Sequence, residues 1–300
     1  MNRWTGVATC EALDLMRFFG PVFAKVAPEI TLLRPEEVED PAAIDFVFSF
    51  VPADDAFTPY PNLRAVFSAG AGMDAIAACP SLPDVPVFRV EDPDQAQQTA
   101  GFAAFHVIWH QRRMGDFIAA QRAHKWARRV GDQSPTLKRI GVMGYGPMGR
   151  AIAKGLSALG YTVTTLSRSQ PDPATPGINH MTNDNIDAFL AQTDILINVL
   201  PLTSETAGLL SAPLFAKLPK GAALIHLGRG AHLNEADLIA ALDSKHLAGA
   251  ALDVFDTEPL PKDSPLWDHP GIFITPHVAS TPQFSAVVEN VQKGMAALEE

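Results

Sequence analysis

The stretch of sequence that decides the fold is Ile140-Gly-Val-Met-Gly-Tyr-Gly-Pro-Met-Gly149, which contains the spacing Gly144-x-Gly146-x-x-Gly149. It follows an apolar run typical of a buried strand and precedes a pattern of helical length. Glycines at these positions allow a tight turn, a close approach of the backbone to a pyrophosphate and close helix packing. The helix N-terminus favours a phosphate, and Pro147 suits its first turn. The spacing alone arises readily by chance, so this strand and helix context carries the prediction of a dinucleotide site.

Beyond Arg139, short apolar runs alternate with patterns of helical length. Two of the helical patterns are Met148–Leu159 and Glu235–Leu242, the second with Asn234 as a plausible N-cap. Such alternation predicts a parallel, doubly wound α/β sheet. The apolar runs that we expect to be its strands are 140–143, 162–166, 195–199, 222–227, 248–254 and 272–275.

The first part of the chain is organised differently, because 11 of the 25 prolines lie at or before Pro93 and none between Pro93 and Pro135. The runs 46–51, 65–68 and 87–90 are typical of buried strands between proline-marked loops, which predicts a small α/β unit. The proline-free stretch can be mostly helix. The last segment, 284–300, is amphipathic and predicts a helix.

Composition limits the classes of protein. Of the 300 residues 47% are hydrophobic and 19% charged, which excludes a disordered chain and a disulfide scaffold. A net charge of −10 argues against broad binding of nucleic acid or anionic membrane. Cys10 and Cys79 stand far apart, so we expect reduced core thiols and no metal site. With no leader pattern at the start and no apolar run of about 18 residues, we expect a cytoplasmic protein.

The choice of cofactor depends on the tip of the second strand of the nucleotide unit, where an acidic residue would hold a ribose diol. Ser167-Arg168-Ser169 stands there instead. A guanidinium with two hydroxyls suits a 2′-phosphate, so NADP is preferred and NAD is the alternative. In that alternative Arg168 is a solvated loop residue or stacks on adenine.

Several motifs follow in a specific order: Leu200-Pro-Leu-Thr203, Glu205-Thr206, Leu227-Gly-Arg-Gly230, Gly249-Ala-Ala-Leu-Asp-Val-Phe255, Glu258-Pro259-Leu-Pro261, Ser264-Pro-Leu-Trp267 and Thr275-Pro-His-Val-Ala279. In this order the chain resembles the D-isomer-specific 2-hydroxyacid dehydrogenases, and it leans toward their glyoxylate/hydroxypyruvate reductase A group. The resemblance covers about 141–279 well, whereas the first 95 residues match mainly at Ser68-Ala-Gly-Ala-Gly-Met-Asp74. It implies a Rossmann dinucleotide-binding domain, 97–280, inserted into a smaller flavodoxin-like substrate domain made of 1–96 and 281–300.

The resemblance assigns Arg229, Glu258 and His277 as the catalytic set, and the chemistry independently asks for these residue types. A 2-oxo acid has a carboxylate and a carbonyl, and the planar, positively charged guanidinium of Arg229 can donate hydrogen bonds to both. His277 can supply the proton that the resulting alkoxide needs, and Glu258 would favour its protonated form and orient the ring. Taken singly, each could be an ordinary turn or loop residue. Their joint place at successive strand ends favours catalysis.

The remaining site residues follow from the same resemblance. Backbone N–H groups of Ala71 and Gly72 would bind the substrate carboxylate, together with Arg229 and His277. The cofactor would contact the glycine turn, the Arg168 loop and the nicotinamide side of the site. These expected cofactor residues are Gly144, Gly146, Pro147, Met148, Gly149, Ser167, Arg168, Ser169, Leu200, Pro201, Thr206, Leu227 and Asp253. We expect a homodimer.

Other features have simpler interpretations. His106 and His110 could share a helix face as metal ligands, but a packed helix is favoured because no third ligand stands near. The basic stretch formed by Arg112-Arg113 and 124–129 favours a solvated or dimer helix over an RNA patch.

The sequence also departs from the family pattern: His226 stands where Asn is usual, and the loop 49–59 lacks a Trp. The printed sequence stops at Glu300, where the family pattern leads us to expect a further C-terminal tail.

These observations favour an NADPH-dependent reductase of small 2-oxo acids such as glyoxylate or hydroxypyruvate. One alternative keeps the fold but acts on phosphite, formate or a bulkier 2-oxo acid. Enzymes of this fold that act on formate carry Gln in place of the catalytic Glu, so Glu258 argues against that branch. An alternative of another class is a non-catalytic, dinucleotide-sensing protein similar to the related transcriptional corepressors.

Overall fold

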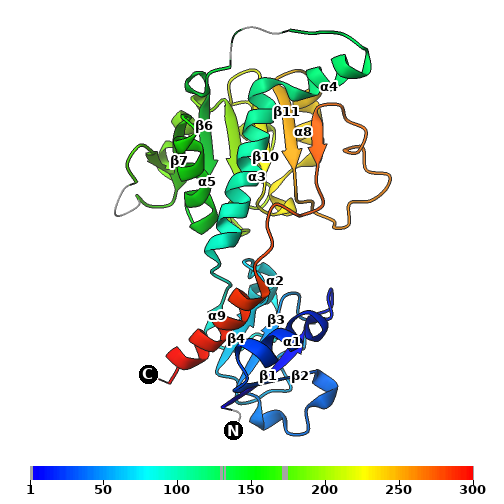
Figure 1. Ribbon diagram of the computed structural model, residues 1–300, viewed down its shortest axis with the longest axis vertical. Coiled ribbons are helices and arrows are strands. Elements are labelled where there is room, and N and C mark those ends of the chain that lie inside the picture. Colours follow the sequence, from blue (N-terminus) through cyan, green and yellow to red (C-terminus); the bar gives the residue numbers. More distant parts are fainter. Residues whose placement is uncertain (1–2, 129–130, 132, 171–174, 300) are drawn as a thin grey trace. The chain divides into compact units, whose positions relative to one another are not determined.

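A computed structural model describes residues 3–128, 131, 133–170 and 175–299. The chain forms two compact units, one of Gln95–Thr281 and the other of Met1–Asp94 with Pro282–Glu300. Each unit has its own parallel sheet and core, and the smaller one contains both ends of the chain (Figure 1). The predicted class, a doubly wound Rossmann sheet with a smaller flavodoxin-like α/β unit, is confirmed.

The larger unit has seven parallel strands in the order β12-β11-β10-β9-β6-β7-β8. They are β6 (Arg139–Met143), β7 (Thr162–Ser167), β8 (Asn179–Thr182), β9 (Ile195–Asn198), β10 (Ala222–His226), β11 (Leu247–Leu252) and β12 (Ile272–Ile274). Its helices are α3 (Pro93–Arg112), α4 (Met114–Arg122), α5 (Pro147–Ala158), α6 (Ile186–Ala191), α7 (Ala212–Phe215) and α8 (Glu235–Asp243). The strand order reverses between β6 and β9, so the crevice at the carboxyl ends of these strands is where such sheets bind ligands.

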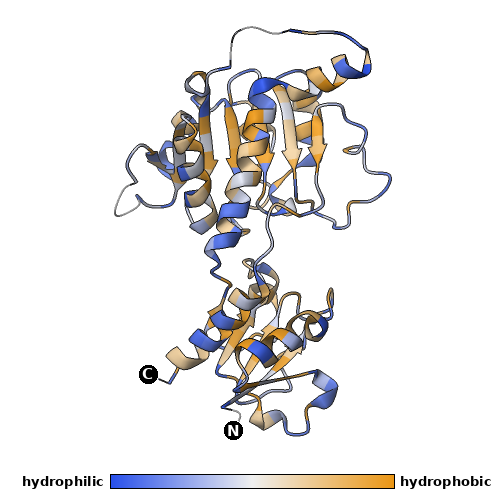
Figure 2. Cartoon of the chain, viewed as in Figure 1, coloured by the Kyte–Doolittle hydropathy of each residue, from blue (hydrophilic) through white to orange (hydrophobic). Residues whose placement is uncertain are grey.

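Helices cover both faces of this sheet, and the strands are therefore apolar on both faces (Figure 2). Ile195 and Ile197 of β9 face the core made with α3 and α5, whereas Leu196 faces the core made with α6, α7 and α8. The predicted N-cap is confirmed, since the Asn234 side chain accepts a hydrogen bond from the Asp237 N–H at 3.0 Å.

The smaller unit has five parallel strands in the flavodoxin-like order β2-β1-β3-β4-β5. They are β1 (Trp4–Thr9), β2 (Ile30–Leu33), β3 (Phe46–Ser49), β4 (Ala65–Ser68) and β5 (Val87–Phe88). Helices α1 (Leu15–Val26) and α9 (Phe284–Ala297) pack on one face, with aromatic side chains of β3 and β4 between them and the sheet. Helix α2 (Asp74–Ala78) covers the other face through Ile76.

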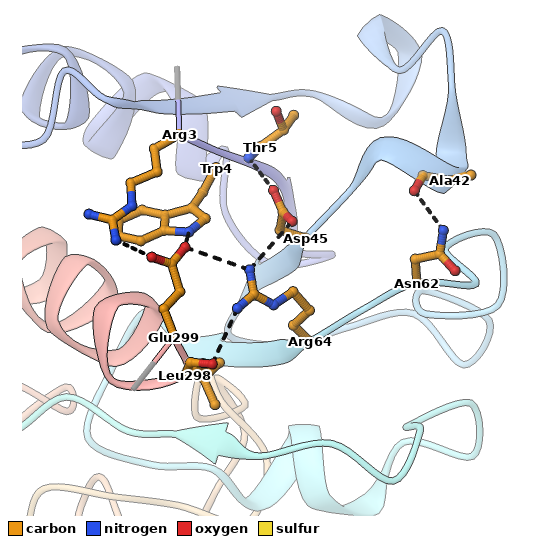
Figure 3. Close-up of polar contacts among 9 residues, drawn as sticks. All are labelled: Arg3, Trp4, Thr5, Ala42, Asp45, Asn62, Arg64, Leu298 and Glu299. Carbon is orange, nitrogen blue, oxygen red and sulfur yellow. Dashed lines mark hydrogen bonds and ion pairs between the residues drawn. The ribbon is translucent and has the colours of Figure 1, made fainter. Parts of the chain in front are cut away.

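Polar contacts fasten the end of the chain to the first strand of the smaller unit (Figure 3). The Glu299 carboxylate forms an ion pair with Arg3 and accepts a hydrogen bond from the Trp4 indole at 2.6 Å. Arg64, next to β4, donates to the Leu298 carbonyl oxygen at 3.4 Å. These contacts hold the segment after α9 in the same unit as the N-terminus.

Several elements differ from the sequence predictions. The sequence analysis does not predict strands β1, β2 and β8. Strand β1 contains Gly6, β2 is only four residues long, and β8 is the polar run Asn-His-Met-Thr. Gly6 is needed where it stands, since a Cβ there would lie 2.2 Å from the Phe46 ring. Helix α1 contains Pro21 and was missed for that reason. The last helix ends at Ala297, before the predicted end at residue 300, which lies outside the described residues.

Both cysteines are free thiols, but only Cys79 is buried, so the expectation of a core thiol is wrong for the partly exposed Cys10. Among the described helices, none has the length and apolar character needed to cross a membrane. Residue 129, the end of the predicted basic stretch, lies outside the described residues.

His106 and His110 are packed into α3 beside the sheet. The His106 side chain is 1% exposed, lies edge-on to the rings of Phe102, Phe105 and Phe273, and has no hydrogen-bond partner for Nδ1 among the described residues. Burial lowers the pKa of His106 to about 4, and burial together with His106 lowers the pKa of His110 to about 4. The packed-helix interpretation therefore fits both residues.

We expect the free energy of unfolding to fall as pH drops from about 6.5 toward 4. In this range the two histidines bind protons in the unfolded chain but stay neutral in the folded protein. Each such proton contributes a slope of up to about 1.4 kcal/mol per pH unit. His106→Leu should lower the slope by up to that amount in urea titrations at fixed protein concentration. His124→Asn, at an exposed histidine, is the control. Parallel curves for His106→Leu and the parent would contradict the assignment.

Candidate active site

The expected functional residues of the larger unit follow the carboxyl ends of its strands. Because the strands are parallel, these ends lie along one edge of the sheet. The glycine turn follows β6, Ser167 ends β7 with Arg168 after it, Leu200 and Pro201 follow β9, Arg229 follows β10, Asp253 follows β11 and His277 follows β12.

The glycine turn has the shape that a bound pyrophosphate requires. Gly144 has φ +102°, a conformation that side chains disfavour, and a Cβ on Gly149 would lie 2.0 Å from the Gly144 carbonyl oxygen. Gly146 is the N-cap of α5, and a Cβ there would meet nothing within 4 Å. The start of α5 is therefore open, with its first N–H groups available to an anion, which fits a dinucleotide.

The loop after β7 presents a cation. The Ser167 hydroxyl donates to the Ser169 carbonyl oxygen at 2.7 Å and so holds the turn. Arg168 between them is exposed, and its guanidinium has no ion pair or hydrogen bond within the described part of the chain. An exposed guanidinium of this kind can bind a phosphate through two parallel hydrogen bonds.

His277 and Glu258 form a pair. The ring Nδ1 lies 2.8 Å from Glu258 Oε2, while Oε1 accepts a hydrogen bond from the Phe255 N–H at 2.9 Å. The His277 side chain is 44% exposed. The carboxylate fixes the ring through Nδ1 and leaves Nε2 as the atom that can exchange a proton.

Asp253 holds the loop that carries His277. Its buried carboxylate accepts hydrogen bonds from the Thr275 hydroxyl at 2.6 Å and from the N–H groups of Val278 and Ala279, each at 2.9 Å. The His277 N–H donates to the Asp253 carbonyl oxygen at 2.7 Å. These bonds keep His277 at φ +54°, which a non-glycine residue adopts only when its surroundings enforce it. The sequence pointed to Asp253 only as a cofactor contact, so this role was missed.

Arg229 lies in an extended conformation just past β10, before the short turn Gly230–His232, and its guanidinium donates to the Gly228 carbonyl oxygen at 2.8 Å. A Cβ on Gly230 would lie 1.8 Å from the carbonyl carbon of Phe255. The Arg229 turn thus packs directly on the residue whose N–H is held by Glu258.

Other expected residues support turns. The Thr206 hydroxyl donates to the Pro201 carbonyl oxygen at 2.8 Å and stabilises the turn after β9, and Leu227 packs beside the core under α3 and α5. Ala71 and Gly72 lie in the smaller unit, in the loop after β4, where the buried Ser68 hydroxyl donates to the Gly72 carbonyl oxygen at 2.7 Å.

Asn198 and His232 were not expected at all. Both are completely buried near Arg229. Asn198 ends an otherwise apolar strand, and a polar side chain in such a run was the signal that could have identified it.

Comparison with known proteins agrees with this arrangement. Residues 104–279 match the family model of the D-isomer specific 2-hydroxyacid dehydrogenase NAD-binding domain. Over 245 residues the chain is 39% identical to "Glyoxylate/hydroxypyruvate reductase A" of Salmonella paratyphi B, which covers 79% of this chain and 78% of that protein. The chain belongs to the D-isomer specific 2-hydroxyacid dehydrogenase family.

Two solved structures extend the likeness to the whole chain. A D-isomer specific 2-hydroxyacid dehydrogenase from Xanthobacter autotrophicus, in complex with NADPH and MES, has a TM-score of 0.92 at 34% identity. An NADPH-dependent glyoxylate/hydroxypyruvate reductase from Sinorhizobium meliloti, in complex with NADP and sulfate, has a TM-score of 0.91 at 32% identity. Each similarity covers 99% of this chain and 95% of the other.

The contact at Gly230 can be tested by adding one methyl group. We expect Gly230→Ala to lower the free energy of unfolding by about 1–3 kcal/mol, since the new Cβ collides with backbone that cannot rotate away. Gly101→Ala is the control, because a Cβ there meets nothing within 4 Å and alanine suits a helix. Urea unfolding gives both values. Equal stability of Gly230→Ala and the parent would contradict the close packing.

Proposed function

We propose that the protein is an NADPH-dependent reductase that converts small 2-oxo acids, glyoxylate and hydroxypyruvate, to 2-hydroxy acids. The observation that carries the proposal is the His277–Glu258 pair, 2.8 Å apart, at the sheet edge that also carries Arg229 and the glycine turn. The names of the relatives support the substrate class, and the cofactors in the solved relatives support NADP, with NAD as the alternative.

The cofactor residues of this chain take defined roles in the proposal. Gly144, Gly146 and Gly149, with Pro147 and Met148, hold the pyrophosphate at the start of α5. Ser167, Arg168 and Ser169 hold the 2′-phosphate, and Leu200, Pro201, Thr206, Leu227 and Asp253 line the nicotinamide side. When bound, the reduced nicotinamide supplies the hydride. In this assignment 97–280 is the dinucleotide-binding domain, while 1–96 and 281–300 form the substrate domain.

The catalytic set then handles charge and protons. Arg229 binds the substrate carboxylate and polarises the carbonyl, so that negative charge can develop on its oxygen. Protonated His277 donates a proton from Nε2 to that oxygen and becomes neutral. Glu258 holds Nδ1 and stabilises the imidazolium before transfer.

The direct test is NADPH oxidation with a panel of 2-oxo acids, alongside NADP reduction with phosphite. We expect turnover of glyoxylate and hydroxypyruvate. Arg229→Ala should lose about 2.7 kcal/mol or more of transition-state stabilisation, roughly a hundredfold in kcat/KM. Near-normal activity of Arg229→Ala would remove its role. NADPH binding without any turnover would support the non-catalytic alternative, and turnover of phosphite alone would change the substrate class.

The pH dependence tests the proton donor. We expect kcat/KM for reduction to fall as pH rises, because the reaction takes up a proton, and kcat/KM for oxidation to rise, because the reverse reaction releases one. Glu258→Gln should lower kcat/KM for reduction, because the carboxylate that holds Nδ1 of His277 is gone. The amide oxygen can still accept the Phe255 N–H. Glu205→Gln, at an exposed carboxylate, is the control. An unchanged kcat/KM for reduction in Glu258→Gln would exclude Glu258 from the mechanism.

Cofactor choice is tested at Arg168. We expect Arg168→Ala to weaken NADPH binding by about 1.5–3 kcal/mol, roughly ten- to a hundredfold, and to leave NADH almost unchanged because NADH has no 2′-phosphate. Lys154→Ala removes an exposed charge from α5 and is the control. The measurement is KM for both cofactors. Equal losses for NADPH and NADH would mean that Arg168 stacks on adenine or supports the loop.

We also propose that the protein acts in the cytoplasm as a homodimer. Exposed apolar side chains gather on α3, α4 and the segment after α4: Phe105, Ile108, Ile118 and Trp126, the last 95% exposed. Burying such side chains against a second copy would stabilise the pair. Light scattering after gel filtration should give twice the chain mass, and Trp126→Ser should shift the equilibrium toward monomer. A parent protein that stays monomeric would refute the dimer.

A further inference from the structure

Three polar side chains are completely buried behind Arg229: Asn198 at the end of β9, His226 at the end of β10 and His232 in the turn that follows. A buried polar group costs stability unless it is hydrogen-bonded. The partners of these three residues therefore identify what the cluster is built to hold.

His226 holds the carbonyl of Arg229. Its Nε2 lies 2.9 Å from the Arg229 oxygen, and since a carbonyl only accepts, Nε2 must carry the hydrogen. Nδ1 is then an acceptor, and the Asn198 amide donates to it at 3.2 Å. Burial, reinforced by the neighbouring His232, lowers the pKa of His226 to about 3. The ring is therefore neutral at any working pH.

His232 holds the other backbone group of Arg229. Its Nδ1 accepts from the Arg229 N–H at 3.1 Å and from the Asn198 amide at 3.1 Å. Nε2 then carries the hydrogen and donates to the Pro201 carbonyl oxygen at 3.2 Å. Asn198 Oδ1 accepts from the Leu200 N–H at 3.4 Å. The cluster thus joins the Arg229 turn to the turn after β9.

The cluster leaves no spare room. A Cβ on Gly228 would lie 2.9 Å from Asn198 Nδ2 and 2.9 Å from His232 Nδ1. Arg229 lies three residues beyond His226, the last residue of β10 that pairs with the neighbouring strands. Two imidazoles of one tautomer take the place of strand partners for Arg229, whose carbonyl oxygen also accepts a hydrogen bond from the His232 N–H at 3.0 Å.

We propose that His226 and His232 are positioning residues, which clamp the carbonyl and the N–H of Arg229 and, through Asn198, lock the Arg229 turn to the Leu200–Pro201 turn. The inference rests on the proposed function, since it deepens the role of Arg229 in substrate binding. The guanidinium of Arg229, which binds the substrate, and the nicotinamide-facing turn then keep a fixed spacing. That spacing is set by buried residues that touch neither the substrate nor the cofactor.

The test uses two amides that imitate different ring atoms. In His226→Gln the side-chain amide reaches the place of Nε2 and can still donate to the Arg229 oxygen, whereas in His226→Asn it reaches only the place of Nδ1. We expect His226→Asn to lose at least tenfold in kcat/KM, mainly through a higher KM for the 2-oxo acid. His226→Gln should recover most of that loss, and the NADPH dissociation constant should change less than about twofold in both.

His246 provides a matched control. Its Nε2 lies 2.8 Å from the Phe215 carbonyl oxygen, before the start of β11 and so at the opposite edge of the sheet. His246→Asn should lower the unfolding temperature as His226→Asn does, yet leave KM unchanged. Equal KM values in the parent and His226→Asn, or no recovery in His226→Gln, would overturn the proposal.

A readout independent of activity separates this inference from the proposed function. Nitrogen NMR of ¹⁵N-histidine-labelled protein at neutral pH should show His226, assigned by its absence in the variant, with hydrogen on Nε2 and none on Nδ1. The opposite tautomer would overturn the clamp whatever the enzyme does. A parent protein that reduces no 2-oxo acid would instead refute the proposed function.

Discussion

Peptide N–H and C=O groups that lie beyond the last paired residues of a parallel sheet have no hydrogen-bond partner on a neighbouring strand. At the carboxyl edge of the larger sheet several of these groups are buried, so they need partners other than water. This structure supplies side chains in their place. The Asp253 carboxylate accepts hydrogen bonds from N–H groups of the loop after β12, and the Glu258 carboxylate accepts one from the Phe255 N–H. His226 and His232 hold Arg229 in the same way. These hydrogen bonds hold in place the loops that carry the candidate active-site residues.

The residues at this edge of the sheet fall into two groups, one buried and one exposed, and the difference in burial fits their different roles. Asn198, His226, His232 and Asp253 are almost completely buried and form hydrogen bonds of fixed direction. His277 and Arg168, in contrast, are partly or largely exposed. Buried networks of satisfied groups are rigid, whereas groups that exchange protons or bind ions need access to them.

Individual residues show how far sequence reasoning reached. The sequence predicts the glycine turn, the N-cap Asn234 and the central strands of the larger sheet, because spacing and apolar runs are local properties. The pairing of Glu258 with His277 was expected from the resemblance and the chemistry, but its distance of 2.8 Å was not available from spacing. The roles of Asn198, His232 and Ser68 were not foreseen, since each depends on a residue brought near only by folding.

The sequence by itself determined the α/β class, the order of strands and helices around the glycine turn and the identities of the charged residues at the strand ends, because short-range periodicity encodes these features. The tertiary structure alone decided which groups hold those residues. Gly6 under the Phe46 ring, Gly230 against Phe255 and His226 against the Arg229 carbonyl are contacts between separate elements. Such contacts depend on close packing in three dimensions, which no local pattern specifies.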